Sequence, residues 1–99
     1  KPAARTQLDK LAARLRAQPL LELRIVGHTD AKGATGANNA LSLDRAASTR
    51  DWLVARGLSP ERIAVAGRGA AAPVASNDSE SGRANNRRVE ILVGERHRR

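Results

Sequence analysis

The sequence predicts a single α/β domain in which helices pack against a β-sheet. Two long segments carry apolar residues at helical spacing, and three short segments have the alternating or uniformly apolar pattern of strands. Their order along the chain is helix, strand, helix, strand, strand, which favours a two-layer sandwich. The 99 residues suffice for one core, because single domains usually contain roughly 100–150 residues.

The composition is typical of a folded chain with a core of small aliphatic side chains. Hydrophobic residues make up 40% of it, more than disordered chains contain. No apolar run approaches the ~18 residues that span a bilayer, and the amino end lacks the apolar stretch of a signal peptide, so we expect a soluble domain. The absence of Cys excludes disulfides, thiolate metal sites and cysteine catalysis, but it does not identify the compartment.

The first helix is expected over about residues 6–18, with Thr6 as its cap and Pro19 marking its end. Its apolar stripe, spaced i, i+3, i+4 and i+7, consists of Leu8, Leu11, Ala12 and Leu15. A strand follows at residues 21–27, because apolar and polar residues alternate there. The side chains expected on its buried face are those of Leu21, Leu23 and Ile25.

A second helix is expected from about Ala40 to Arg56, after a loop over residues 28–39. The loop has no periodicity, and loops of about a dozen residues in a compact domain are usually functional or disordered. Asn38 and Asn39 are suited to cap the helix, and Gly57 is suited to end it. The apolar side of this helix is expected to consist of Leu43, Ala46, Leu53 and Val54.

The rest of the chain is expected to hold two further strands joined by a loop. Residues 59–61 have proline in the first turn of a short helix, and residues 63–67 form a strand of small residues. Residues 68–84, rich in Gly, Ala, Ser and Asn, are expected to be mostly loop. Residues 88–93 alternate again, with a core face formed by Val89, Ile91 and Val93.

Three segments carry motifs at consistent spacing. Residues 27–30 read Gly-His-Thr-Asp after a strand, Asn38 precedes Leu-Ser-Leu-Asp-Arg-Ala at 41–46, and residues 82–91 read Gly-Arg-Ala-Asn-Asn-Arg-Arg-Val-Glu-Ile. From about Leu8 to Val93 the chain resembles the OmpA-like carboxy-terminal domain, which also occurs in the peptidoglycan-associated lipoprotein and in flagellar stator subunits. The resemblance implies a mixed sheet packed on two main helices. The family normally has another strand before the first helix, and we expect this strand to be absent here.

The resemblance also implies non-covalent binding to peptidoglycan through the diaminopimelate side chain of its stem peptide. The family's ligand-holding aspartate and arginine match Asp30 and Arg45. Diaminopimelate ends in an ammonium and a carboxylate on one carbon, so its site needs an anion and a cation close together. Arg can grip a carboxylate with two parallel hydrogen bonds, and Asp30 follows a strand end, where open α/β sheets place ligands. We expect Arg45 early in its helix, whose positive amino end also favours an anion.

Further residues are expected at this ligand site: Thr29, Asn38, Leu41, Arg87 and Arg88. Thr29 would complete hydrogen bonds, Asn38 would cap the helix, touch the ligand or do both, and Leu41 shares a helix flank with Arg45. Arg87 and Arg88 precede the final strand with opposite orientations, so one would approach the ligand carboxylate, and alternation does not say which.

His28 and Trp52 have simpler interpretations. A His-x-Asp pair without a third ligand is a weak metal or acid–base signature, so we expect His28 to be a structural histidine that hydrogen-bonds the loop. Trp52 is expected to be a half-buried helix residue rather than a platform for sugar stacking.

The net charge of +8, from 18 Lys and Arg against 10 Asp and Glu, makes a nucleic-acid-binding domain the alternative. Against it, the basic residues are spread along the chain, and a single aromatic residue provides no platform for base stacking. A wall hydrolase would need paired carboxylates, a metal cluster or an activated nucleophile, and neither Ser42 nor Ser48 lies in a nucleophile-elbow pattern. We therefore expect no enzyme activity, no cofactor and no metal.

These expectations define one peptidoglycan-binding domain over residues 1–95, followed by a basic tail at residues 96–99. The domain would tether a larger envelope protein to the cell wall in the periplasm, as part of an outer-membrane-associated protein. Membrane contact would come only through the remainder of that parent protein, and nucleic acid would not be a partner.

Overall fold

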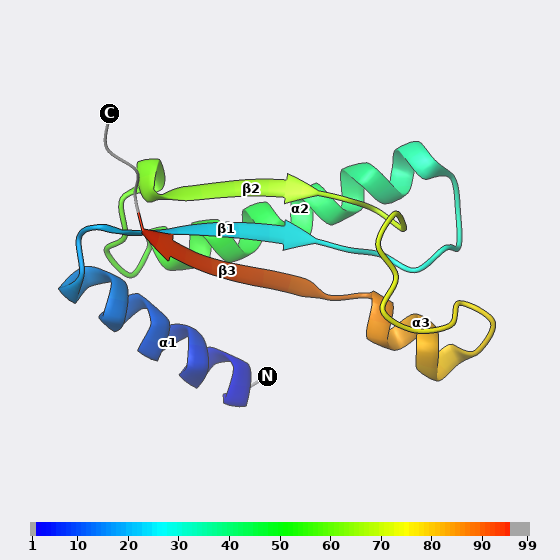
Figure 1. The fold of residues 1–99 in the computed structure, drawn as a ribbon, viewed down its shortest axis with the longest axis horizontal. Helices are drawn as coiled ribbons and strands as arrows, with labels where there is room; N and C mark the ends of the chain where they lie inside the picture. The colour runs from blue at the N-terminus through cyan, green and yellow to red at the C-terminus, as the bar shows by residue number, and fades with distance from the viewer. Residues whose placement is uncertain (1, 96–99) are drawn as a thin grey trace.

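The computed structural model describes residues 2–95, with side chains from Thr6 onward; the expected basic tail lies outside the described residues. Helices and strands alternate along this range (Figure 1). The elements in chain order are α1 (Pro2–Ala17), β1 (Leu21–Gly27), α2 (Thr35–Val54), η1 (Pro60–Arg62), β2 (Ile63–Gly67), α3 (Glu80–Asn86) and β3 (Val89–Glu95), where η1 is a 3-10 turn. Within residues 2–95 no helix combines the length and the apolar character that a membrane span requires.

The sheet is mixed and has the order β2-β1-β3. The central strand β1 pairs in parallel with β2, with Gly27 beside Gly67, and antiparallel with β3, with Gly27 beside Val89. The mixed sheet and the helices packed on it confirm the expected fold class. No strand precedes α1 within residues 2–95, so β3 is an edge strand of the described sheet.

One face of the sheet carries the apolar core. Ile25 and Leu23 of β1 are buried there against α1 and α2. The core cluster consists of Ala12, Leu15, Leu23, Ile25, Ala46, Leu53, Leu58 and Ile63. Arg62 covers the end of the core near the start of β1, because its guanidinium donates hydrogen bonds to the carbonyls of Leu15, in the last turn of α1, and Gln18, just after that helix.

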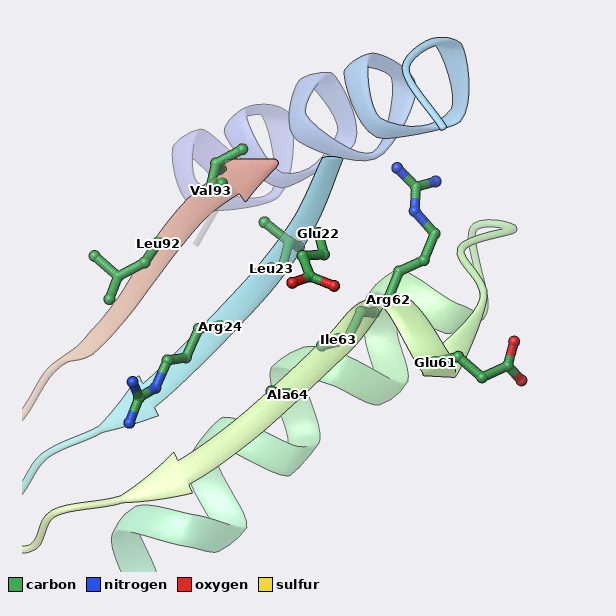
Figure 2. Close-up of a pocket in the computed structure, with 10 residues that line it drawn as sticks. Glu22, Leu23, Arg24, Glu61, Arg62, Ile63, Ala64, Leu92 and Val93 are labelled. Atoms are coloured by element: carbon green, nitrogen blue, oxygen red, sulfur yellow. The ribbon is translucent and has the colours of Figure 1, made fainter. Parts of the chain in front are cut away.

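The opposite face of the sheet is more open and carries alternating charged and apolar residues. Arg24 of β1 lies beside Leu92 of β3 and Ala64 of β2, and both Arg24 and Leu92 are exposed. Figure 2 shows Arg24 and Leu92 projecting from neighbouring strands. Both residues line a hollow of about 350 Å³.

Two paired glycines bring α2 close to the sheet at the carboxyl ends of β1 and β2. A Cβ atom at Gly27 would overlap the backbone carbonyl of Ser42, and one at Gly67 would lie 2.5 Å from the backbone nitrogen of Leu43. Main-chain contact without an intervening side-chain layer therefore sets the position of α2 over this end of the sheet.

Both helix starts differ from the sequence expectation. The helix α1 begins at Pro2, so Thr6 is inside it and is not its cap, and α2 begins at Thr35 instead of about Ala40. The N-cap of α2 is Ala34, without a side-chain cap, so the prediction that Asn38 and Asn39 cap this helix is wrong. Tertiary packing overrides the weak helix propensity of the Gly- and Asn-rich first turn, since Asn38 is buried against the Asp30 loop.

The stretch from residue 68 to residue 84 is mostly loop, as expected, but its end belongs to a short helix, α3, which is capped by the Ser79 side chain accepting the Gly82 N–H. The expected apolar faces are less covered than predicted, because Leu43 is 43% exposed, Val93 37% and Val89 36%. Val89 and Val93 lie on the edge strand β3.

Most of the other boundaries lie close to the sequence expectation. The strands β1 and β2 begin and end at the predicted residues, the predicted proline turn is η1, and β3 continues to Glu95, two residues beyond its predicted end. Gly57 adopts φ +96° just after α2, as expected for a glycine that ends a helix.

Candidate functional site

The candidate site lies at the end of the sheet where β1 and β2 end and β3 begins. Because β3 runs antiparallel to β1, the residues after Gly27 meet the residues before Val89, although they are far apart in sequence. Parallel pairing brings the segment after Gly67 to the same end. The loop after β1 is fastened there by the Arg68 N–H to the Gly27 carbonyl, at 3.0 Å, and the Thr29 N–H to the Gly69 carbonyl, at 2.8 Å.

Asp30 is a nearly buried anion at the centre of this site. Its residue is 8% exposed. One carboxylate oxygen, Oδ1, accepts the Lys32 backbone N–H at 3.0 Å, and the other, Oδ2, accepts from Arg87 Nη1 at 2.7 Å. The Arg87 hydrogen bond, with the Lys32 N–H second, holds the pKa of the Asp30 carboxyl below its ordinary value of 3.8. Asp30 is therefore a fixed negative charge at neutral pH.

Arg87, and not Arg88, reaches the aspartate. The Arg87 guanidinium lies between two carboxylates, with Nη1 on Asp30 and Nη2 on Glu80 Oε1 at 3.0 Å. Arg88 points elsewhere and donates to Glu90 Oε2 at 3.0 Å and to the Ala72 carbonyl at 2.9 Å. The alternation before β3 thus separates the two arginines as expected, and Arg87 is the one at the site.

Arg45 reaches the same loop from α2. Its Nη1 donates a long hydrogen bond of 3.5 Å to the carbonyl of His28, two residues before Asp30, and its side chain is half-buried. Within residues 6–95, the carboxylate of Asp30 is ion-paired with Arg87 and not with Arg45. The expectation that Arg45 is early in its helix is wrong, because α2 begins ten residues before it. The positive end of that helix therefore lies near Asn38 and not near Arg45.

The other predicted site residues are placed as follows. The Thr29 hydroxyl donates to the Asp30 carbonyl at 2.9 Å, and the Asn38 side-chain amide makes a 3.5 Å contact with the same carbonyl. Both residues are buried and shape the loop around the carboxylate. Leu41 is different, because it is 44% exposed on the surface of α2 and no described contact joins it to Asp30.

A hollow of about 430 Å³ adjoins the Asp30 loop. Small and polar residues of three segments line it: the loop after β1, the first turn of α2, and the segment after β2. The lining residues are Ala31, Gly33, Thr35, Asn38, Asn39, Arg68, Ala70 and Ala71. Asn38 borders both this hollow and the Asp30 carbonyl, so a ligand held there would lie beside the site.

His28 is buried, but its imidazole bonds strand β3 and not the loop expected from the sequence. It is 2% exposed, and its Nε2 lies 3.1 Å from Glu90 Oε1 on the neighbouring strand β3. Arg88 first and His28 second lower the pKa of Glu90 below its ordinary value of 4.5. No group of three potential metal-ligating side chains occurs among the described residues, so nothing in this part of the chain assembles a metal site.

Three residues that organise the site were not found from the sequence. Ser42 is fully buried, and its hydroxyl donates to the Asn39 carbonyl and accepts the Gly69 N–H, both at 2.9 Å. Asn86 is also fully buried and holds the turn at residues 74–77 through the Val74 and Ala75 N–H groups. Glu80 fixes the outer half of Arg87. Only tertiary structure distinguishes these residues from ordinary polar surface residues.

Trp52 is half-buried, as expected, and packs against the core. The guanidinium of Arg56 stands 3.1 Å from its ring centroid and also donates to Asp9 Oδ1 at 2.8 Å. The cation covers the ring face that stacking would require, which argues against a sugar platform.

The mixed sheet packed against helices is the architecture of the OmpA-like class, and its candidate site holds Asp30 paired with Arg87, with Arg45 bonded to the same loop. The chain belongs to the OmpA family, whose model matches residues 1–87, and this confirms the resemblance seen in the sequence motifs.

Relatives and solved structures support this assignment. The chain is 46% identical over 97 residues to outer membrane protein A of Bordetella avium, covering 97% of this chain and 50% of that protein. It is 46% identical over 92 residues to the peptidoglycan-binding protein ArfA of Mycobacterium tuberculosis, covering 93% of this chain and 28% of that protein. The chain thus spans half or less of these relatives. The crystal structure of the peptidoglycan-associated lipoprotein from Burkholderia pseudomallei superimposes with a TM-score of 0.91 at 28% identity, covering 95% of this chain and 80% of that one.

Proposed function

We propose that this domain binds peptidoglycan non-covalently and anchors the protein that contains it to the cell wall. Membership of the OmpA family and the names of its relatives support the ligand class. The observation that carries the proposal is the buried Asp30 carboxylate with the Arg45 guanidinium bonded to the same short loop. The relatives' names also support an envelope location, which we propose to be the periplasm.

The site suits a ligand that carries an ammonium and a carboxylate on one carbon, as the free end of diaminopimelate does. Each Asp30 carboxylate oxygen accepts one described hydrogen bond and keeps a further lone pair for an ammonium. Arg45 donates one long hydrogen bond, from Nη1 to the His28 carbonyl, so the other N–H groups of its guanidinium remain to bind a carboxylate. The adjoining hollow would receive the rest of the stem peptide, beside Asn38.

The proposed role is binding without catalysis. The charged groups at the site hold one another in fixed positions, and no described nucleophile faces a general base there. The buried hydroxyls of Thr29 and Ser42 are already hydrogen-bonded, Thr29 to the Asp30 carbonyl and Ser42 to the Asn39 carbonyl and the Gly69 N–H. A site of this kind recognises charge and shape and leaves the wall polymer intact.

Sedimentation with purified peptidoglycan sacculi tests the proposal. Asp30→Ala and Arg45→Ala should each lower the bound fraction, because either change leaves the ligand's opposite charge without a partner in a partly dry site. Asp44→Asn, an exposed acid on α2 next to Arg45, is the matched control and should bind like the parent chain. Undiminished sedimentation of both folded Ala variants would reject the proposal.

Competition with small ligands tests the diaminopimelate specificity separately. A stem peptide that contains diaminopimelate should displace the domain from sacculi, whereas the same peptide with lysine in that place, whose free end has the ammonium but lacks the carboxylate, should displace it much less. Equal displacement by the diaminopimelate and lysine competitors would mean that Arg45 does not bind the ligand carboxylate. The alternative of nucleic-acid binding predicts an affinity that falls steeply with salt and is indifferent to Asp30.

A further inference from the structure

We propose that Glu80 is a positioning residue for ligand binding. It accepts a hydrogen bond from one of the two terminal nitrogens of Arg87, so that Arg87 binds only one oxygen of Asp30 and leaves the carboxylate accessible to an ammonium group. This inference rests on the proposed function of the site. Glu80 would not touch the ligand; it would act through Arg87.

The geometry of Arg87 is the first line of evidence. An arginine facing one aspartate alone can bind both carboxylate oxygens with two parallel hydrogen bonds. Here Arg87 contacts only Oδ2 of Asp30, through Nη1 at 2.7 Å, while its Nη2 donates to Glu80 Oε1 at 3.0 Å. The guanidinium is therefore shared, and Oδ1 of Asp30 is left with the single N–H of Lys32. A ligand ammonium can reach Asp30 without first displacing a two-pronged arginine.

The charge of the cluster is the second line of evidence. Asp30 and Arg87 alone would form a neutral pair, which has little net attraction for a cation. With Glu80 added, the three side chains carry one net negative charge. Lys32 and Arg83 also lie near these carboxylates, and the Nε of Arg83 lies 4.0 Å from Glu80 Oε1, so the five side chains together carry one net positive charge, which would rise to two if Glu80 were neutral. Glu80 therefore halves the cationic excess that a ligand ammonium meets at Asp30.

The short helix α3 fixes the partners of this arrangement. Glu80 is its first residue, and Arg87 is its C-cap. Its start is capped by Ser79, and its last residue, Asn86, is fully buried and bonded to the turn at residues 74–77. The backbones that carry Glu80 and Arg87 are thus held by contacts independent of the ion pair. Replacing Glu80 should change the charge distribution without unfolding the helix.

The test compares Glu80→Gln with Asp78→Asn, a matched loss of one negative charge two residues away on the exposed loop. Affinity for a soluble diaminopimelate-containing muropeptide is measured by calorimetry at low and high salt. Glu80→Gln should weaken binding about two- to fivefold at low salt, as expected for a partly exposed ion pair, and less at high salt. Asp78→Asn should stay closer to the parent chain at both salt concentrations. Unchanged or tighter binding by Glu80→Gln would overturn the proposal.

A second readout separates this role from a merely structural one. In Glu80→Ala, which removes the acceptor as well as the charge, Arg87 is released to Asp30, so the Asp30 carboxyl should titrate at lower pH, when followed by NMR, than in Glu80→Gln, whose amide oxygen can still accept from Arg87. Loosening of the loop would move the titration in the opposite direction, towards the ordinary value, and would count against the proposal. The NMR measurement needs no ligand. If the parent chain fails to bind the muropeptide, the proposed function fails, while the Asp30 titration still tests the effect of Glu80 on Arg87.

Discussion

The two ends of the sheet are built from different kinds of residue. At the end where β1 begins, Leu15, Leu23 and Ile63 are buried together, and a single arginine, Arg62, satisfies backbone carbonyls around them. At the end where β1 finishes, the buried side chains are mainly polar: His28, Thr29, Asp30, Asn38, Ser42 and Asn86. The first end stabilises the fold by removing apolar surface from water. The second holds charged groups in fixed positions with hydrogen-bonding capacity left over, which is what a binding site requires.

The largest expected effect lies at the apolar end. Leu15→Ala should lower the free energy of unfolding by about 2–5 kcal/mol, because it leaves a cavity in a close-packed core. Urea denaturation followed by circular dichroism measures the loss. Below the melting temperature of the variant, its affinity for sacculi should match that of the parent chain. A parallel fall in affinity would show that the two ends are coupled.

Asn86→Ala should affect both properties, because Asn86 belongs to the polar end and supports the segment before Arg87. Its loss leaves the N–H groups of Val74 and Ala75 without their described acceptor. The free energy of unfolding should fall by about 1–3 kcal/mol, the usual cost of leaving buried polar groups without hydrogen-bond partners. Sacculus binding should fall as well, since the turn at residues 74–77 also supports the Ala31 N–H through Asn77. Loss of stability with unchanged binding would confine Asn86 to a structural role.

Asp30→Asn should reduce ligand binding much more than it reduces stability, the opposite of Leu15→Ala. Arg87 retains Glu80 as a partner in this variant, so the melting temperature should fall only modestly, by the contribution of the ion pair between Asp30 and Arg87. Affinity for sacculi should fall by about tenfold or more, because the amide offers no charge to the ligand ammonium. Calorimetric melting and sedimentation of the same preparation provide both numbers. A large drop in melting temperature would assign Asp30 mainly to the fold.

The smallest expected effect is a loss of stability in acid that comes from the polar end. Asp30 has its pKa held below 3.8, and Glu80 and Glu90 have theirs held below 4.5, by Arg87 or Arg88 in each case. The unfolded chain therefore binds more protons than the native chain in this range. The contribution of these carboxylates is complete above their ordinary pKa values and is lost as the pH falls through their native ones.

Urea unfolding at a series of pH values between about 6 and 3 measures this dependence. A double variant, Asp30→Asn with Glu90→Gln, should show a shallower decline than the parent chain. Equal slopes for the two proteins would place the acid sensitivity elsewhere in the molecule.

The fold was largely predictable from local patterns, whereas the site was predictable only in part. Alternation located β1, because its burial largely follows the side-chain period, and the run of small apolar residues ending at Gly67 located β2. The first turn of α2 was missed because its helicity depends on the burial of Asn38, a tertiary effect. The short helix α3 was missed because it has little apolar periodicity and is held by the Ser79 cap and by Asn86.

At the site, the motifs pointed to Asp30 and Arg45, but not to the ion pair that Asp30 makes. That pair depends on the antiparallel register of β1 and β3, which places residues 30 and 87 together. Sequence patterns also could not decide between Arg87 and Arg88, because the decision depends on which groups each guanidinium contacts in the tertiary structure. Glu80 left no signal in the sequence, because an exposed glutamate in a first helical turn is common for reasons of helix stability alone.

The contact of α2 with Gly27 and Gly67 has a consequence for ligand choice. The helix that carries Asn38 and Arg45 rests on the sheet through main-chain atoms, so no change of rotamer can bring it nearer or let it settle deeper. The distance between the α2 backbone that carries Arg45 and the loop that carries Asp30 is therefore set by main-chain contact. A ligand held between them would be selected by the distance between its own charged groups, because the backbone of the domain would not adjust to it.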